Sequence, residues 1–214
     1  MIKAKVAGER LSLDAKAGAY WEKEQTLFLA DLHLGKAAHF RKAGIAVPTG
    51  VSNSNMDKLI ALLLEFKPSR VIFLGDLFHS EWNHSLNELG DLVKQFDTIT
   101  FELVEGNHDI LDAAQYEKIG LIVHSEGYVL EPFILTHHPL EKVHEYLYNL
   151  SGHIHPCVLL NGSAKQRLRL PCFYFGKKQG ILPAFGEFTG MGEVLPKMGD
   201  QVFVIIDDMV LQVS

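Results

Sequence analysis

The sequence has little cysteine, no excess of positive charge and no long hydrophobic run. Its two cysteines, Cys157 and Cys172, are too few for a disulfide framework and lack the Cys-x-x-Cys spacing of structural zinc. We therefore expect two reduced thiols in the core. The net charge of −6 argues against a broad, non-specific nucleic-acid surface. It leaves room for one cleft made locally positive by bound divalent cations.

Segments that would cross a membrane or direct secretion are also lacking. The longest apolar run, Leu59 to Leu64, is far shorter than the roughly 20 residues of a membrane-spanning helix. The N-terminal residues Met1 to Lys5 lead into an alternating segment, without the apolar stretch of a signal peptide. The sequence therefore predicts a cytoplasmic protein without membrane contact.

The composition is that of a globular domain. Hydrophobic residues make up 47% and charged residues 21% of the 214 residues, which is enough for a sizeable core. The chain shows no repeat, linker or low-complexity tract, so we predict one domain over residues 1–214.

Apolar runs of strand length alternate with amphipathic segments in the first half of the chain. Continuous apolar runs, typical of strands covered on both faces, are Thr26–Ala30, Val71–Leu74, Ile99–Val104 and Phe133–Thr136. Helical spacing of apolar residues predicts three helices: one from Ser52–Asn55 to just before Pro68, one from Leu86 to Phe96, and a weaker one from Ile110 to about Lys118. This alternation indicates βαβ units.

Short strands dominate after Leu121, and the segment before residue 25 predicts a hairpin. The later strands are expected at Tyr128–Leu130, Tyr148–Leu150, Val158–Leu160, Phe173–Phe175, Val202–Ile206 and Val210–Val213. Together these elements predict an α/β fold of two packed mixed β-sheets, a four-layer α/β/β/α sandwich with the helices outside.

Polar motifs follow the apolar runs directly. They are Asp31-Leu32-His33, Gly75-Asp76, Gly106-Asn107-His108-Asp109, Thr136-His137-His138 and Gly152-His153-Ile154-His155. Ligands in α/β folds bind beyond the carboxyl ends of the strands. We therefore expect these motifs to meet at one rim of the molecule.

The donor types point to metal chemistry. Carboxylate, imidazole and amide donors suit Mn²⁺, Fe or Zn²⁺. Along an extended backbone, Asp31 and His33 would point to the same side, as would His153 and His155. Asp76 follows a glycine and could approach closely enough to bridge two ions about 3.5–4 Å apart.

Each motif taken alone has a non-functional interpretation. Gly75-Asp76 is a common turn, Asp109 could cap a following helix, and His137 and His138 could be core imidazoles. The five motifs in this order, each at a strand end, favour a metal site.

In these motifs the sequence resembles the calcineurin-like metallophosphoesterase superfamily, over roughly Ala30 to Pro156. The resemblance implies two divalent metal ions, with Mn²⁺ favoured over Fe or Zn²⁺. The first would be held by Asp31, His33, Asp76 and His155, and the second by Asp76 as a bridge with Asn107, His137 and His153.

The resemblance also implies a reaction. A hydroxide held between the ions would attack phosphorus. His108, oriented by Asp109, would act as general acid, and His138 would face the substrate. His79 stands where many superfamily members carry an aspartate.

Further stretches resemble a narrower group, the bacterial ligase-associated DNA damage response endonucleases (PdeM). They are Asp31 to Lys36 with Phe40-Arg41-x-x-Gly44 and Val47-Pro48-x-Gly50, Leu74 to Ser80, and Leu182 to Gly190. This resemblance implies DNA as the substrate, a role in repair, and association with a DNA ligase and a helicase. Just past the first metal motif lie Lys36, Arg41 and Lys42, which could contact the phosphates of a substrate strand.

Other interpretations remain open. The same chemistry could act on a small nucleotide, a phosphomonoester or a lipid-linked pyrophosphate. A scaffold that lost catalysis would have broken ligand positions, whereas all are filled here. A basic cluster could contact nucleic acid, or its members could be solvated loop charges; it consists of Lys165, Arg167 and Arg169. Three aromatic side chains could stack on bases or belong to the core, namely Tyr174, Phe185 and Phe188.

Overall fold

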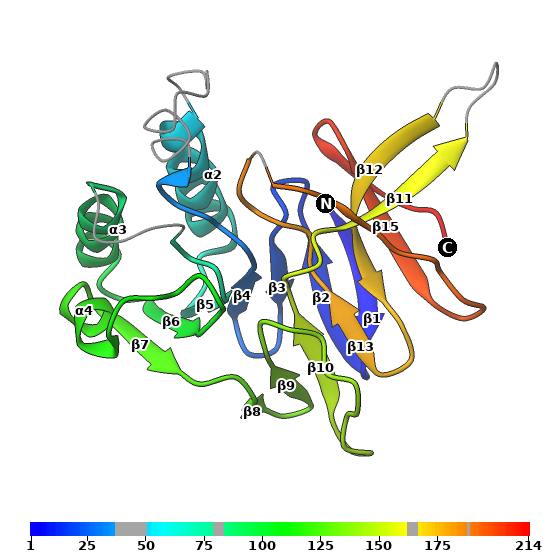
Figure 1. The fold of residues 1–214 in the computed structure, drawn as a ribbon, viewed down its shortest axis with the longest axis horizontal. Helices are drawn as coiled ribbons and strands as arrows, with labels where there is room; N and C mark the ends of the chain where they lie inside the picture. The colour runs from blue at the N-terminus through cyan, green and yellow to red at the C-terminus, as the bar shows by residue number, and fades with distance from the viewer. Residues whose placement is uncertain (37–50, 79–83, 162–166, 188) are drawn as a thin grey trace.

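Two β-sheets pack face to face, with helices against one of them (Figure 1). The computed structural model describes residues 1–36, 51–78, 84–161, 167–187 and 189–214. Within these residues the α-helices are α2 (Val51–Phe66), α3 (His84–Gln95) and α4 (Ala113–Lys118). None of them is long and apolar enough to cross a membrane.

The first sheet has seven strands in chain order. They are β1 (Ile2–Val6), β2 (Glu9–Leu13), β3 (Ala19–Trp21), β4 (Thr26–Leu29), β5 (Arg70–Leu74), β6 (Thr100–Val104) and β7 (Leu121–His124). Strands β1 to β4 are antiparallel neighbours, and β4 to β7 are parallel. The N-terminal segment is therefore a three-stranded meander that joins the sheet. The expected hairpin accounts for only two of these three strands.

The second sheet has nine strands and is also mixed. In spatial order it contains β14 (Gly192–Glu193), β11 (Pro156–Asn161), β12 (Arg167–Phe175), β13 (Gln179–Ile181), β10 (Tyr148–Ser151), β9 (Phe133–Leu135) and β8 (Tyr128–Leu130). Two further strands extend it from β12, namely β15 (Gln201–Ile206) and β16 (Met209–Gln212). Strands β9, β10 and β13 run parallel.

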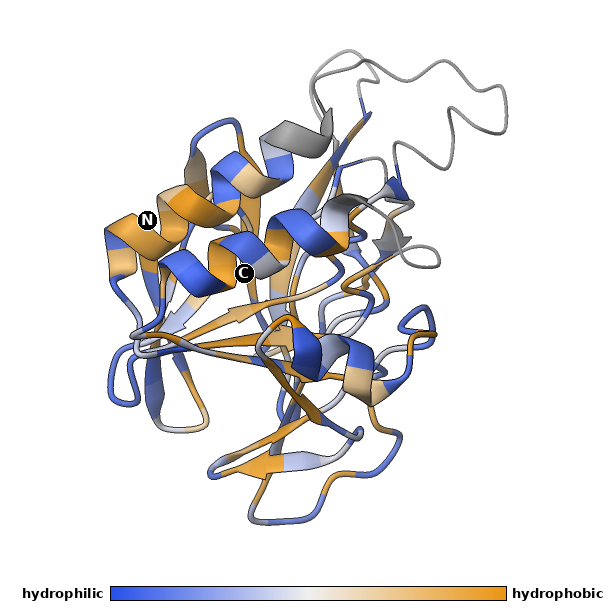
Figure 2. Cartoon of the chain, turned by 90° about the vertical axis from the view of Figure 1, so that its left-hand side faces the viewer, coloured by the Kyte–Doolittle hydropathy of each residue, from blue (hydrophilic) through white to orange (hydrophobic). Residues whose placement is uncertain are grey.

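The described helices cover the outer face of the first sheet. Leu59 and Leu63 of α2, Leu89 of α3 and Tyr116 of α4 belong to one core with Phe73 of β5. Figure 2 shows α2 and α3 with apolar residues on one side and polar residues on the other, as this packing requires. The α/β sandwich of two mixed sheets is confirmed. The described residues place no helix on the outer face of the second sheet, so the expected fourth layer is not formed by them.

A second core fills the space between the sheets. The Trp21 ring meets Phe133 edge-on at 5.0 Å between centroids, and Phe28 meets Phe133 in the same manner at 6.1 Å. Apolar contact of this kind fixes one sheet against the other, because core aromatics dominate packing energy. The carboxyl ends of β4 to β6 are thereby held near those of β9 and β10.

A polar cluster joins the two sheets at their edge. Glu102 of β6 is buried and forms ion pairs with Arg70 and with His124, whose Nε2 lies 2.6 Å from the carboxylate. Arg70 also donates to the Tyr128 hydroxyl at 3.1 Å, and the His124 and Tyr128 rings stack at 3.8 Å. The cluster therefore ties β5, β6 and β7 to β8.

Candidate metal centre

The predicted side chains follow strands of both sheets and meet where those strands end. Asp31 and His33 follow β4, Asp76 follows β5, and Asn107 follows β6. From the second sheet, His137 follows β9, while His153 and His155 follow β10. The packing of the two sheets therefore assembles the cluster from segments far apart in sequence.

The first group of donors is Asp31, His33 and His155, whose ligand atoms lie within 4.8 Å of one another. The His155 Nε2 is 3.3 Å from the Asp31 carboxylate, and the His33 Nε2 is 3.8 Å from Asp76 Oδ2. His155 Nδ1 donates to the Gly190 carbonyl at 2.8 Å. This outer hydrogen bond leaves the lone pair of the neutral ring on Nε2, the atom that faces Asp31.

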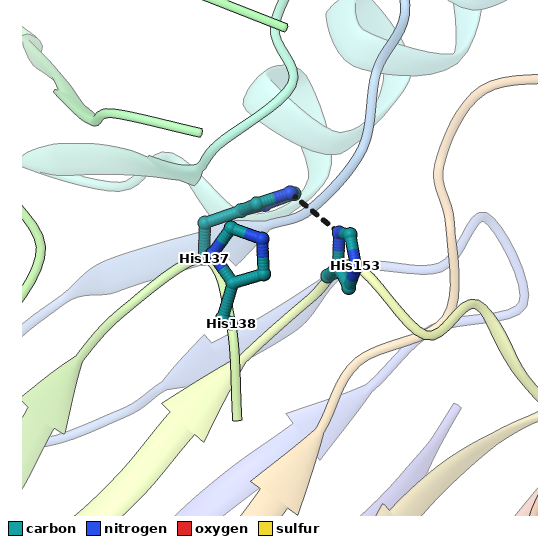
Figure 3. A group of neighbouring side chains, drawn as sticks. All are labelled: His137, His138 and His153. Atoms are coloured by element: carbon teal, nitrogen blue, oxygen red, sulfur yellow. Dashed lines mark hydrogen bonds between the residues drawn. The ribbon is translucent and has the colours of Figure 1, made fainter. Parts of the chain in front are cut away.

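The second group surrounds His137 Nε2. This atom lies 3.0 Å from His153 Nδ1, 3.1 Å from Asn107 Oδ1 and 3.3 Å from Asp76 Oδ1. Figure 3 shows the first of these contacts as a line between a ring nitrogen of His137 and a ring nitrogen of His153. His137 Nδ1 donates to the Leu74 carbonyl at 3.0 Å, so a neutral ring presents its lone pair to the group.

Asp76 stands between the two groups. Its Oδ2 faces His33 and its Oδ1 faces His137. Oδ1 also accepts the backbone N–H of His108 at 3.0 Å. One carboxylate thus presents an oxygen to each donor set, which is the geometry that a bridging ligand needs.

Strong electrostatic coupling runs through this pair of groups. Burial favours the protonated form of Asp76, but the hydrogen bond and charge of His137 outweigh it and lower the pKa of Asp76 to about 2. Burial favours the neutral ring of His137, but Asp76 and the Leu74 carbonyl raise the pKa of His137 to about 9. Without metal, the two form an ion pair at neutral pH.

The backbone is left-handed at five of the seven candidate ligand positions. The φ angles are 55° at Asp31, 46° at His33, 51° at Asp76, 66° at His153 and 49° at His155. The expectation of extended Asp-x-His and His-x-His segments is therefore wrong, because a positive φ at each donor aims the side chain. Backbone conformations of this kind cost about 1–3 kcal/mol each and cluster at functional sites.

Three motif glycines make room for ligands of neighbouring strands. A Cβ on Gly75 would stand 2.3 Å from the His137 ring, one on Gly106 would stand 2.5 Å from the backbone of Asp76, and one on Gly152 would stand 2.5 Å from Asp31 Oδ2. A side chain at any of these positions would displace a candidate ligand or the backbone that carries it.

His108 and Asp109 occupy different environments. The His108 residue is exposed, and its ring centroid lies 5.9 Å from that of His33. The Asp109 carboxylate accepts backbone N–H groups of Gly106 and Leu77, both at 2.9 Å, and burial raises its pKa to about 6 against these hydrogen bonds. It braces the loops after β5 and β6, while the N-cap of α4 is Asp112 and not Asp109.

The sequence missed Glu126, which lies in the turn between β7 and β8. Its Oε1 accepts the N–H groups of His137 at 2.8 Å and of His138 at 2.7 Å, and it lies 3.0 Å from His138 Nδ1. His138 is half-exposed beside His153, with ring centroids 4.2 Å apart. A lone glutamate in a turn carries no motif, so pattern alone could not have identified it.

Of the residues expected to contact substrate, the structure describes Lys36 and His138. Burial lowers the pKa of Lys36, while the charges of Asp76 and Asp31 act to raise it, so the ammonium lies within reach of the cluster. Five residues singled out in the sequence lie outside the described residues, namely Arg41, Lys42, His79, Lys165 and Phe188.

The more distant candidates for base stacking are structural. Phe185 is buried in the core, and the Tyr174 hydroxyl donates to Asp200 at 2.6 Å. Arg167 is exposed at the start of β12, and Arg169 donates to the Met191 carbonyl at 3.2 Å.

The donor set fits divalent cations. Two carboxylates, four imidazoles and an amide oxygen, without a thiolate, suit a pair of ions of the Mn²⁺, Fe or Zn²⁺ type. The outer hydrogen bonds on His137 and His155 add the support that metal-binding imidazoles usually have.

Comparison with known proteins agrees with this geometry. The crystal structure of Pseudomonas putida nuclease MPE matches with a TM-score of 0.81 and 29% identity over 99% of each chain. A phosphoesterase from E. coli, Yfce, aligns over 88% of this chain and 97% of its own at 14% identity and a TM-score of 0.44, too distant to bear on the site. The comparison with curated proteins found no match. The model of the calcineurin-like phosphoesterase family matches residues 25–176, so the chain belongs to that family of metal-dependent phosphoester hydrolases.

Proposed function

We propose that this protein is a dinuclear metal-dependent phosphodiesterase that cleaves DNA, as a nuclease working in repair. The observation that carries the proposal is the position of Asp76, with one carboxylate oxygen toward His33 and the other toward His137. The likeness to Pseudomonas putida nuclease MPE over the full chain supports nucleic acid as the substrate.

The ligand roles follow from the two donor groups. Asp31, His33 and His155 would hold one ion, Asn107, His137 and His153 the other, and Asp76 both. Bound cations would withdraw charge from the phosphate oxygens and lower the pKa of water to about 7, so that hydroxide is available as the nucleophile. We propose Mn²⁺, with Fe or Zn²⁺ as the alternatives that the same donors accept.

The chain's own residues would handle protons and position the substrate. His108 is exposed beside the cluster and is the proposed general acid, because an imidazole can donate a proton to a leaving oxygen near neutral pH. Orientation of its ring by Asp109 stays a prediction. Lys36 and His138 would contact the phosphate and its ester groups, and Arg41 is proposed for the same role on sequence grounds alone.

Association with a DNA ligase and a helicase rests only on the resemblance of the sequence to the PdeM group. Co-purification of the intact protein with each partner, at moderate salt, would test it. If neither the ligase nor the helicase co-purifies at a salt concentration where both stay soluble, this part of the proposal is wrong.

Hydrolysis by the metal-stripped protein, with and without added Mn²⁺, tests the main proposal. Bis-p-nitrophenyl phosphate, p-nitrophenyl phosphate and a single-stranded oligonucleotide should be compared under the same conditions. We expect Mn²⁺-dependent cleavage of the diester and the oligonucleotide. Cleavage of the monoester alone would replace the nuclease by a small-molecule phosphoesterase.

Two aspartate variants sharpen this experiment. Asp76→Asn removes a charge shared by both donor groups and should weaken metal binding and abolish cleavage. Asp208→Asn makes the same chemical change at an exposed position in the β15–β16 turn and should behave as the wild type. Full activity of Asp76→Asn would overturn the assignment of the centre.

A further inference from the structure

A cavity of about 230 Å³ opens beside the candidate metal centre. It is lined by His155, Pro171, Ala184, Gly186, Thr189 and Met191. Because His155 belongs both to this lining and to the first donor group, the cavity and the metal centre share a wall. A group attached to a phosphate at the centre would therefore have the cavity within reach.

The outer wall is a segment fixed at both ends. At its start, the Phe185 N–H donates to the Ala30 carbonyl at 2.9 Å, and the Gly186 N–H donates to the Asp31 carbonyl at 3.0 Å. At its end, the Gly192 N–H donates to the carbonyls of Ile154 and His155, each at 3.1 Å. Each anchor lies on or beside a candidate ligand, so the cavity wall is held in register with the centre.

Close backbone contact reinforces the first anchor. A Cβ on Gly186 would stand 2.4 Å from the Leu32 carbonyl oxygen, so the segment lies directly against the loop between Asp31 and His33. The wall is therefore fixed against the metal-centre loop at Gly186, and a fixed wall limits the entropy lost on binding.

The walls have the chemistry of a site for a small ring. Pro171, Ala184 and Met191 offer apolar surface, and Thr189 adds a hydroxyl. The volume of about 230 Å³ is below the roughly 300–1,000 Å³ of sites that enclose drug-sized ligands, so the occupant should be a small group. Arg169 donates to the Met191 carbonyl at 3.2 Å, which ties the backbone of this wall to β12.

We propose that this cavity binds the nucleoside on one side of the phosphate that is hydrolysed, with the base against Pro171, Ala184 and Met191. The proposal rests on the proposed function, since it names the subsite that a nucleotide diester would fill there. Phosphate contacts alone do not distinguish a nucleotide from any other phosphoester. The cavity supplies that distinction.

Product binding tests the proposal without relying on turnover. Calorimetric titration of the Mn²⁺-loaded protein should compare inorganic phosphate with thymidine 5′-monophosphate and thymidine 3′-monophosphate. Inorganic phosphate reports on the metal centre alone. We expect at least one of the nucleotides to bind about tenfold more tightly than phosphate, which corresponds to ~1.4 kcal/mol.

Filling the cavity should remove this advantage. In Ala184→Leu the nucleotide should bind about as weakly as phosphate, while phosphate itself keeps its wild-type affinity. Ala114→Leu makes the same change at an exposed position of α4 and should retain the tenfold preference. A preference unchanged in Ala184→Leu, or absent from the wild type, would overturn the proposal.

A second variant guards against a disturbed fold. If Ala184→Leu weakens phosphate as well, Met191→Ala decides, because Met191 is 38% exposed and its truncation leaves the core intact. Met191→Ala should lower the affinity for the nucleotide and leave the affinity for phosphate unchanged. Wild-type affinity for both ligands would overturn the proposed subsite. Failure to cleave any diester would instead count against the proposed function, while the binding comparison stands.

Discussion

His108 lies beside the metal cluster with its backbone N–H on Asp76 and with an exposed side chain. His108→Ala leaves the backbone donor and every proposed ligand in place. We therefore expect full metal content and a kcat lowered by about 10²–10⁴-fold. Elemental analysis of the purified variant, together with steady-state kinetics on bis-p-nitrophenyl phosphate, would measure both quantities.

His144→Ala supplies the matched control, because His144 is exposed, its ring contacts Tyr146, and it belongs to none of the donor groups. It should retain both metal and activity. If His108→Ala lost its metal ions, His108 would have to be reassigned from proton donor to ligand.

The pair of Asp76 and His137 predicts a pH dependence for the metal-free protein. The pKa of His137 is raised from 6.5 to about 9, so its contribution to stability is complete below 6.5 and is lost as the pH rises through 9. The pKa of Asp76 is lowered from 3.8 to about 2, so its contribution is complete above 3.8 and is lost as the pH falls through 2. The metal-free melting temperature should fall between pH 6.5 and pH 9.5.

Metal binding should release the proton that the His137 ring carries in the metal-free protein. A cation at His137 Nε2 requires the neutral ring, so binding at pH 7.5 releases a proton and tightens as the pH rises toward 9. Titration calorimetry in two buffers of different ionisation enthalpy counts that proton. Equal heats in both buffers would contradict the ion pair.

At the scale of structural elements, the glycines after the strands decide whether the ligands can converge. Gly152→Ala would push a Cβ to 2.5 Å from Asp31 Oδ2 and 2.8 Å from the Ala30 side chain. We expect metal affinity to fall at least about tenfold, the lower limit seen when the support of a ligand is lost. Equilibrium dialysis against Mn²⁺ would measure it.

Gly8→Ala separates this effect from ordinary destabilisation. Gly8 has a φ of +88° and open space around it, so alanine strains the backbone without touching a ligand. Its melting temperature should fall while its affinity for Mn²⁺ stays at the wild-type value. A Gly152→Ala protein that binds Mn²⁺ normally would show that Asp31 can move aside.

The sequence predicted these elements where pattern and packing agree. The apolar run before Asp31 and the run before Asp76 are β4 and β5, since a strand buried on both faces is apolar throughout. The third helix begins at Ala113 and not at Ile110, because Asp112 is its N-cap. Local spacing could not give the left-handed turns at the ligands, which depend on contacts between strands.

At the scale of the whole molecule, the cluster around Glu102 connects the two sheets. Glu102→Ala would leave Arg70 and His124 without their shared carboxylate. Breaking a buried ion pair from one side costs about 3–5 kcal/mol, and we expect about 3 here because the Arg70 and His124 side chains are partly exposed and can still reach water. Denaturant unfolding, read by circular dichroism, would give the loss.

Asp91→Ala is the comparison for this variant. The Asp91–Lys94 pair lies on the surface of α3, with side chains 70% and 74% exposed, so its loss should cost less than about 0.5 kcal/mol. If both variants lost the same small amount, the Glu102 cluster would not join the sheets energetically.

The sequence predicted two mixed sheets with helices, but it did not predict that the described helices would all pack on the first sheet. Alternating strands and helices predicted βαβ units, and β4, α2, β5, α3 and β6 form them. The second sheet has no such alternation, and its outer face carries a small cluster around Val158, Cys172 and Val204. How that face is covered depends on tertiary packing that no local pattern records.

The two cysteines lie on the second sheet, Cys157 in β11 and Cys172 in β12. Both thiols are free and buried, and burial raises the pKa of Cys172 to about 12. Alkylating reagents attack the thiolate, so in the closed molecule burial keeps the reagent away from both thiols, and the raised pKa also keeps Cys172 protonated. Alkylation then marks only those molecules whose β11–β12 pairing has opened. The rate at which the two cysteines are alkylated therefore measures how often the second sheet opens locally.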